Sequence, residues 1–424
     1  MQYRCCYWMV MVAVVAPACA NDASPMVLER FRTQIRETLK QLPDYTCLQS
    51  IERSRRPSES VAYKAIDSIR VQVGLIGGSE RYSWPDSRRF EDTELRNLVG
   101  KGVVSTGNFA LHVQHVFLSP ATQYSARGEA PANGRKGLRY DYELPVEHSR
   151  YMLRFPPNEE EVGVRGSFLL DAETLDLMHL EVIADEISPE MGVMAVTHSI
   201  DYARTPIGNG QFLLPGKARL TVIDLTGEEH RNDSVFSECR QYKAESKLSF
   251  ETEGEAKPEA DPGAAAISSL PVRLTVEAAL AHDIDPSAAA LGDGITAVVS
   301  KPVVHEGKTL AGAGATLQGR LVRLDKETIP FPHYVVGLEF HTLKSGDASY
   351  DFSATMQQAG PSAGLIRQTK RMDPVFTKRR QKRFDILVRE KPRGEGVLHW
   401  DAKKPKVPKG LRTVWVTIDS PDSQ

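Results

Sequence analysis

A segment with few apolar residues, from residue 251 to residue 269, divides the chain and limits how it can fold. Its sequence, ETEGEAKPEADPGAAAISS, is rich in Glu, Ala, Pro and Gly. A stretch with so little surface to bury does not offset the entropy of ordering its backbone, which is typical of a linker. We therefore expect two domains, residues 21–250 and residues 270–424, on either side of this linker.

The first twenty residues have the parts of a secretory signal peptide. An apolar run from residue 5 to residue 15 follows a single arginine and precedes the small-residue end ACA at 18–20. The run is shorter than the roughly 20 apolar residues that cross a bilayer, and the end matches a cleavage site. We expect residues 1–20 to be removed and the protein to be exported, to the periplasm or the outer membrane. A lipid-modified Cys19 is the alternative, although the residues before it differ from the usual lipobox.

Two cysteines, Cys47 and Cys239, remain after the signal peptide. Both belong to the first expected domain and lie near its two ends. Cysteines of an oxidising compartment are commonly paired, and the sequence around these two shows no base that would favour a catalytic thiol. We predict that Cys47 and Cys239 form a disulfide. Closing so long a loop contributes about 5 kcal/mol in the chain-entropy account of disulfide stability.

The charge of the chain does not favour a nucleic-acid partner, because the formal net charge is −2 at pH 7. A local excess of basic residues lies near the C-terminus. Its candidate contact residues are Lys378, Arg379, Arg380, Lys382 and Arg383. In an exported protein such a cluster is a candidate contact with an anionic envelope surface, such as lipid headgroups. The alternative is a solvated sheet edge that carries charge against aggregation.

The first expected domain begins with an amphipathic helix and continues with strands. Ser24-Pro25 is a typical helix start, apolar residues follow at helical spacing, and Pro43 ends the pattern. Alternating apolar residues and Gly-containing turns predict seven or more antiparallel strands, with a second helix near residues 108–117. We expect an α+β fold in which a curved antiparallel sheet packs on the N-terminal helix. The candidate apolar ligand contacts are Phe31, Ile35, Leu39, Val71, Val73, Leu220 and Val222.

The second expected domain is mostly β. Stretches such as VRLTVEAAL, ATLQGRLVRL and HYVVGLEFHTL alternate in polarity and are separated by turns that contain Gly, Asp or Pro. This spacing of short strands predicts a small barrel or a sandwich.

Three stretches of the first expected domain share a pattern with a known superfamily. They are TCLQSIERS after the first helix, DSIRVQVGLIGGSERYSWPDSRRF, and GSFLLDAETLDLMHLEV with its Asp at a hairpin tip. Together they resemble the outer-membrane lipoprotein carrier superfamily, whose members include lipoprotein-sorting and lipid-handling periplasmic proteins. The whole chain is similar to exported bacterial proteins with the same two parts. The resemblance implies a sheet that curves around a lipid or a lipoprotein acyl chain.

Two patterns that could serve chemistry have simpler interpretations. The sequence GPSAG at 360–364 has the spacing of a nucleophile elbow, but no strand–turn–helix pattern surrounds Ser362, so we expect a turn. His112 and His115 have the spacing of two metal ligands on a helix. No third ligand lies near them in the sequence, so we expect packed or surface histidines.

A group of carboxylates, Asp171, Glu173 and Asp176, could serve acid–base chemistry. It falls at a predicted hairpin tip, where the preferences of turns account for it. With no convincing catalytic set, we predict no enzymatic activity and no cofactor.

The function that we expect is therefore that of a non-enzymatic cell-envelope protein that binds a lipid or another apolar ligand between the helix and the sheet. The alternative is a structural adaptor that has a filled core and recruits other envelope proteins. A hydrolase is the third interpretation and rests on the serine pattern alone.

Overall fold

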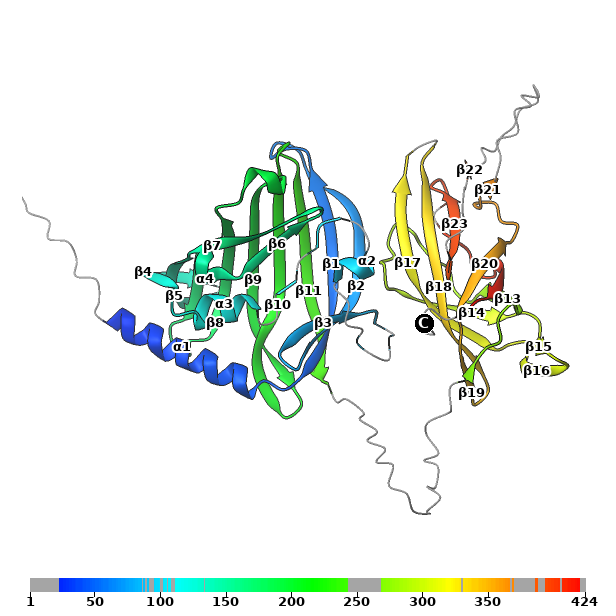
Figure 1. The fold of residues 1–424 in the computed structure, drawn as a ribbon, viewed down its shortest axis with the longest axis horizontal. Coiled ribbons are helices and arrows are strands. Elements are labelled where there is room, and N and C mark those ends of the chain that lie inside the picture. Colours follow the sequence, from blue (N-terminus) through cyan, green and yellow to red (C-terminus); the bar gives the residue numbers. More distant parts are fainter. Residues whose placement is uncertain are drawn as a thin grey trace, which may run out of the picture.

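The computed structural model describes residues 23–85, 87, 90, 95–99, 102–104, 106–107, 111–132, 134–242, 268–328, 331–366, 368–369, 386–387, 393–404 and 406–419. Two large, curled sheets dominate it, one built before the expected linker and the other almost entirely after it (Figure 1). The chain is thus mostly β, and the α+β expectation describes only its N-terminal helix and the sheet behind that helix. None of the described helices is long and apolar enough to cross a membrane.

The first sheet has eleven strands and four helices around it. The helices and the 3-10 turn are α1 (Ala23–Gln41), α2 (Leu95–Val99), α3 (Leu111–Leu118), α4 (Val146–Ser149) and η1 (Pro189–Met191). The strands are β1 (Tyr45–Arg56), β2 (Lys64–Ile76), β3 (Ser79–Ser83), β4 (Gln123–Ala132), β5 (Arg135–Leu144), β6 (Tyr151–Phe155), β7 (Asn158–Asp171), β8 (Leu177–Asp185), β9 (Val193–Ile207), β10 (Gly210–Asp224) and β11 (Glu229–Gln241). Their order is β3-β2-β1-β11-β10-β9-β8-β7-β5-β4, and β6 pairs with β7.

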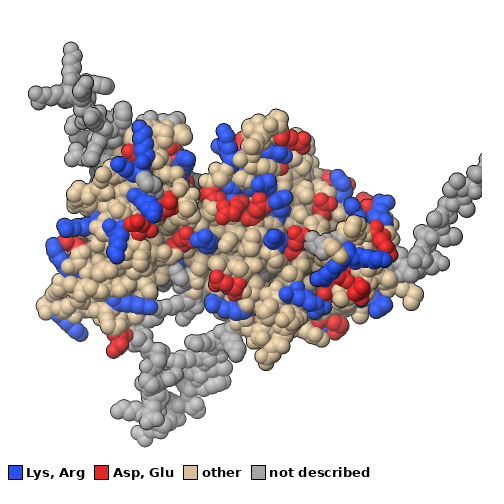
Figure 2. Space-filling model, turned by 180° about the vertical axis from the view of Figure 1, so that it is seen from behind, with Lys and Arg blue, Asp and Glu red and all other residues tan. Residues whose placement is uncertain are grey.

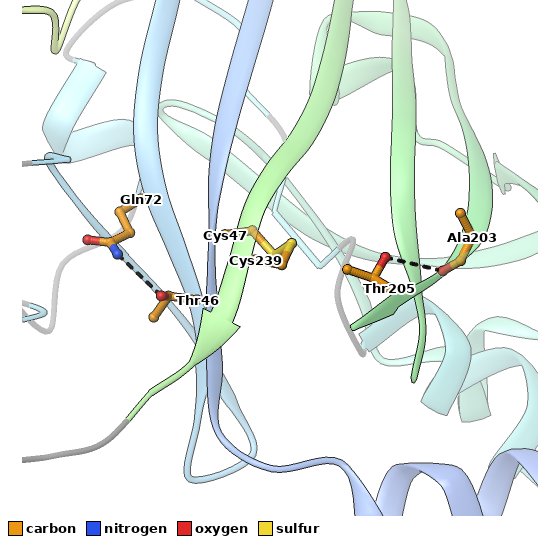
Figure 3. The surroundings of a disulfide bond; sticks show 6 residues. All are labelled: Thr46, Cys47, Gln72, Ala203, Thr205 and Cys239. Atoms are coloured by element: carbon orange, nitrogen blue, oxygen red, sulfur yellow. Dashed lines mark hydrogen bonds between the residues drawn. A yellow bond between two sulfur atoms is a disulfide. The ribbon is translucent and has the colours of Figure 1, made fainter. Parts of the chain in front are cut away.

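The first long strand of this sheet pairs with its last one. Strand β1 lies between β2 and β11, and a bulge between Thr46 and Leu48 shifts its register against β11. The Cys47–Cys239 disulfide joins the two neighbouring strands at this bulge, with the Cα atoms 4.0 Å apart (Figure 3). The predicted disulfide is therefore confirmed.

One face of the first sheet, here called the inner face, is covered by other elements. A row of paired residues crosses it from β5 to β2. The row is Tyr140, Phe168, Leu180, Ile200, Ala218, Ser234, Ile51 and Ile69. Because side chains on alternate positions of a strand share a face, residues two apart from these also point inward.

Helices α1 and α3 cover the inner face over β5, β7 and β8. Phe31 of α1 packs edge-on against Phe117 of α3, with ring centroids 4.9 Å apart, and stacks on Phe168 of β7 at 5.8 Å. The guanidinium of Arg32 donates hydrogen bonds to the carbonyls of Phe117 and Ser119, at the C-terminal end of α3. These contacts fix the N-terminal half of α1. Both predicted helices of this region are confirmed.

Two other groups of residues cover the rest of the inner face. Near β1 and β2, Leu95 of α2 is fully buried in a cluster that contains Val71 and Val73. Near the ends of β8, β9 and β10, Leu153 of β6 and Met191 of η1 form another buried cluster. A sheet of eleven strands is far wider than one helix, so several elements are needed to cover it.

The second sheet consists of β12 (Ser268–Ser269), β13 (Thr275–Leu280), β14 (Gly294–Val299), β17 (Thr316–Glu327), β18 (His333–Ser345), β19 (Ala348–Asp351), β20 (Ala354–Ala359), β23 (Gly396–Asp401) and β24 (Arg412–Thr417). Two short pairs, β15 (Val303–His305) with β16 (Lys308–Ala311) and β21 (Gln368–Thr369) with β22 (Ile386–Leu387), lie outside it. Its order is β12-β19-β18-β17-β14-β13-β24-β20, with β23 on β18.

The second sheet curls until strands far apart in its order meet. The Met356 amide of β20 donates to the carbonyl of Glu395, just before β23, at 3.3 Å. Inside the curl, Phe340 and Trp415 pack edge-on with ring centroids 5.1 Å apart, and Trp400 is also buried. The domain boundaries expected at 250 and 270 stay a prediction, because residues 251–267 lie outside the described part of the chain.

A short loop of the second part, residues 290–293, binds the edge of β2 in the first part. Leu291 accepts a hydrogen bond from the Arg70 amide at 2.7 Å and donates one to the Ser68 carbonyl at 2.8 Å. Arg70 also forms an ion pair with Asp293. Gly292 has a φ of +87°, and a Cβ atom there would lie 2.1 Å from the Arg70 carbonyl oxygen, so the close approach requires glycine.

Candidate functional site

A cavity of about 220 Å³ lies between the C-terminal half of α1 and the inner face of the first sheet. Residues from α1 and the position after it, α3, the β7–β8 turn, β8, β9 and β10 line it. They are Gln34, Ile35, Thr38, Leu39, Gln41, Leu42, Val113, Leu175, Asp176, Leu177, Tyr202, Arg204, Gln211, Phe212 and Leu213. The wall therefore mixes apolar side chains with polar ones in nearly equal number.

The helical spacing of α1 accounts for one wall of the cavity. Ile35, Leu39 and Leu42 follow Phe31 at steps of three or four, which places them on one side of a helix. Phe31 fills its part of that side with the aromatic contacts described above. Beyond it the smaller side chains leave space, and the helix ends where the Leu42 amide still donates to the Thr38 carbonyl at 3.0 Å.

The β7–β8 turn supplies the second wall. A carboxylate oxygen of Asp171 accepts hydrogen bonds from the Glu173 amide at 2.9 Å and from the Thr174 amide at 3.0 Å. These amides also lower the pKa of Asp171. Leu175 takes a left-handed φ of 58° and is buried, so the turn directs a leucine into the cavity. The hairpin tip predicted for these carboxylates is confirmed.

An ion pair lies at the edge of the cavity. Arg204 of β9 donates from Nε and Nη2 to the two carboxylate oxygens of Asp176, both at 2.7 Å. The Asp176 side chain is 14% exposed and the Arg204 side chain 52%. The neighbouring carboxylate raises the pKa of Arg204. Asp176 belongs to the β7–β8 turn, where its backbone carbonyl accepts a hydrogen bond from the Asp171 amide, so the backbone fixes the acidic partner of the pair.

Tyr202 contributes a buried hydroxyl to the same region. Its Oη atom is buried and forms no hydrogen bond within the described part of the chain. Burial raises the pKa of Tyr202, so the phenol stays protonated at neutral pH. A buried donor without a partner is unusual in a folded protein and costs stability.

A second group of polar side chains, here called the polar patch, lies where the three clusters of the inner face meet. It consists of Gln49, His112, His198, Asn232 and Ser234. Four of these, all except His112, line a cavity of about 10 Å³. Gln49 Nε2 donates to Ser234 Oγ at 3.2 Å, while its Oε1 atom has no partner among the described residues.

The two histidines of the polar patch are neutral at physiological pH. Their rings lie 4.8 Å apart and both are at least 96% buried, with 3% and 4% exposure. Burial lowers the pKa of His198 to about 4. Burial, followed by the proximity of His198 and His115, lowers that of His112. No group of three or more His, Cys, Asp or Glu side chains suited to a metal occurs among the described residues.

The sequence-predicted ligand contacts separate into three places on the inner face. Ile35 and Leu39 line the cavity, and Phe31 lies in the aromatic group beside it. Val71 and Val73 are fully buried in the cluster with α2. Leu220 and Val222 are buried under β6 and η1. The structure thus brings only the helix residues to the cavity, and contact with a ligand stays a prediction for all of them.

Two other sequence patterns can be placed only in part. Ser362 lies in a turn after β20, where the Leu365 amide donates to its carbonyl at 3.1 Å, and no helix follows it in the described residues. The basic residues at 378–383 lie outside the described part of the chain. On the visible face of Figure 2, basic and acidic side chains alternate without a large patch of one sign.

Solved structures that are similar to about half of the chain include the following three. A domain of an outer-membrane lipoprotein-sorting protein from Vibrio parahaemolyticus is 11% identical with a TM-score of 0.28, and the match covers 52% of this chain and 94% of that one. A DUF1329 family protein from Desulfovibrio piger is 10% identical with a TM-score of 0.30, covering 53% and 96%. A LolA superfamily protein from Nitrosomonas europaea is 8% identical with a TM-score of 0.26, covering 50% and 94%.

The names of the first and third of these structures refer to lipoprotein sorting and to the LolA superfamily. No protein-family model matches the sequence, and no curated protein matches it. At such low identities and TM-scores, the function of the chain has to be argued from its own residues.

Proposed function

We propose that this chain is an exported, non-enzymatic envelope protein that binds an apolar group, such as the end of an acyl chain, in the cavity beneath the C-terminal half of α1. The observation that carries the proposal is the cavity itself. Eight of its fifteen lining side chains are apolar, and they come from both the helix and the strands behind it. Burying an apolar group against such walls removes its surface from water and is favourable.

The volume limits what the cavity can hold. Ligand pockets for whole drug-sized molecules have volumes of roughly 300–1,000 Å³, and this cavity is smaller. If each methylene occupies about the share of a water molecule, roughly 30 Å³, the space accepts about seven methylenes. Each one contributes about 0.8 kcal/mol, which corresponds to an affinity gain of about fourfold per carbon. The gain should stop when the cavity is full.

A series of 1-alkanols from butanol to dodecanol tests this proposal. In a methyl NMR titration of the full chain, Ile35 and Leu39 should shift, and the affinity should rise about fourfold per carbon before it levels off near seven or eight carbons. Leu39→Trp should abolish the shift of Ile35 by filling the space. The matched control is Met26→Trp on the same helix, since Met26 is 72% exposed and lies outside the cavity.

The adaptor with a filled core remains the second candidate, because most of the inner face is closed by the aromatic group, by α2 and by β6. If no alkanol binds and Leu39→Trp is as stable as the parent, the cavity is only a packing defect and the adaptor is favoured. The proposed contact of Lys378, Arg379, Arg380, Lys382 and Arg383 with an anionic envelope surface stays a prediction.

A further inference from the structure

We infer that the cavity selects a ligand whose polar head is uncharged and forms hydrogen bonds, and discriminates against a carboxylate or a phosphate. The inference deepens the function proposed above and rests on it. It follows from the charges and the hydrogen-bonding groups at the edge of the cavity, where the polar head of a ligand with its apolar end inside would lie.

The edge of the cavity carries no net charge that would attract an anion. Among the lining residues, Arg204 is the single cation and Asp176 the single anion, and each satisfies the other through two hydrogen bonds of 2.7 Å. The remaining N–H groups of Arg204 point to no described acceptor. An anion that approached them would also approach the Asp176 carboxylate, which is the like charge. The attraction and the repulsion therefore largely cancel.

Asp176 is not free to move away from an incoming anion. Its backbone carbonyl accepts a hydrogen bond from the Asp171 amide at 2.9 Å, and its amide donates to Thr174 Oγ1 at 3.3 Å. The β7–β8 turn, which also places Leu175 in the cavity, thus fixes the position of Asp176. A ligand carboxylate would have to displace a preorganised, mostly buried partner of the arginine, and it would lose its own hydration in the process.

Neutral donors and acceptors are abundant at the same edge. The carboxamides of Gln34, Gln41 and Gln211 line the cavity and form no hydrogen bond to other described residues. Each offers both an acceptor oxygen and two N–H donors. The Thr38 hydroxyl, which donates to the Gln34 carbonyl at 2.9 Å, can still accept. This set matches an amide, an ester or a hydroxyl head, whose desolvation it can compensate.

The experiment compares two ligands of equal length, octanamide and octanoate, by methyl NMR titration of the full chain at pH 7.5, where octanoate is ionised. The parent should bind octanamide at least about tenfold more tightly, a difference that corresponds to about 1.4 kcal/mol. In Asp176→Asn the unpaired Arg204 should tighten octanoate binding by about the same factor and leave octanamide unchanged. Asp233→Asn, in the Arg219–Asp233 ion pair away from the cavity, is the matched control and should change neither.

A second variant keeps the test decisive if the first disturbs the turn. Arg204→Gln leaves Asp176 alone at the edge, so it should weaken octanoate binding further and spare octanamide. Equal or tighter binding of octanoate by the parent, or no gain in Asp176→Asn, would overturn the inference while the proposed function stands. Binding of neither ligand by the parent would overturn the proposed function, and the inference with it.

Discussion

Acid should destabilise the first sheet through the two buried histidines of the polar patch. His198 has a folded-state pKa of about 4, below the value of about 6.5 for a free histidine. Because the pKa of His198 is lower in the folded chain than in the unfolded chain, the unfolded chain binds a proton at a higher pH than the folded chain does. The contribution to stability is therefore fully present above pH 6.5 and is lost as the pH falls from 6.5 towards 4.

Other rings surround the two imidazoles. His112 of α3 faces His198 of β9, the Tyr151 ring of β6 lies 5.6 Å from His112, and His115 is the other titratable side chain that acts on it. Burial is therefore the cause that lowers the pKa of His198, and it is the first cause for His112.

The size of the effect follows from the two pKa values of His198. Between pH 7 and pH 5 the difference of about 2.5 units costs about 2 kcal/mol of unfolding free energy for this one residue. Urea unfolding of the full chain, followed by circular dichroism at both pH values, measures it. His198→Gln should reduce the pH-dependent loss by about 2 kcal/mol, whatever the variant does to stability at pH 7.

His148→Gln serves as the control, because it makes the same replacement at an exposed position of α4. An equal pH dependence in the parent and in His198→Gln would refute the reasoning. It would mean that His198 takes up its proton in the folded protein without cost, through opening of the α3 cover or through a counter-charge.

Two further predictions concern the covalent and the backbone links. Reduction of the Cys47–Cys239 disulfide should lower the unfolding free energy by about 2–5 kcal/mol. Urea unfolding with and without a reductant checks this. An unchanged midpoint would show that the disulfide adds no stability to strands that are already paired. Gly292→Val should break the contact of residues 290–293 with β2 and speed hydrogen exchange of the Arg70 amide by at least about tenfold. The control Gly312→Ala should leave this exchange unchanged, because a Cβ there meets nothing within 4 Å. Unchanged exchange at Arg70 in Gly292→Val would contradict the required close approach.

Local patterns predicted the elements that depend on neighbouring residues. The apolar spacing and the flanking Ser and Pro residues located α1 to within two residues, because a helix is set by contacts three and four positions apart. The carboxylates around Asp171 located the β7–β8 turn, because an aspartate that accepts from the next amides is a local device. Predicting the disulfide required only the expected oxidising compartment and the two cysteines that follow the expected signal peptide.

The cavity could not be located in the same way. Strand alternation correctly predicts that Val73 and Leu220 are buried, but not which element covers them on a sheet eleven strands wide. The Arg204–Asp176 pair joins residues 28 positions apart through the pairing of β8 with β9. The loop at Leu291 meets β2 from more than 200 residues away. Such contacts have no signature within a short window of sequence.

The pairing of β1 with β11 also separates synthesis from folding in time. Cys239 follows Cys47 by 192 residues, and ribosomes add roughly 5–20 residues per second, so β1 waits about 10–40 s for its second neighbour. During that interval β1 can pair only with the adjacent hairpin strand β2. The first sheet can therefore be completed only after more than half of the chain has been synthesised.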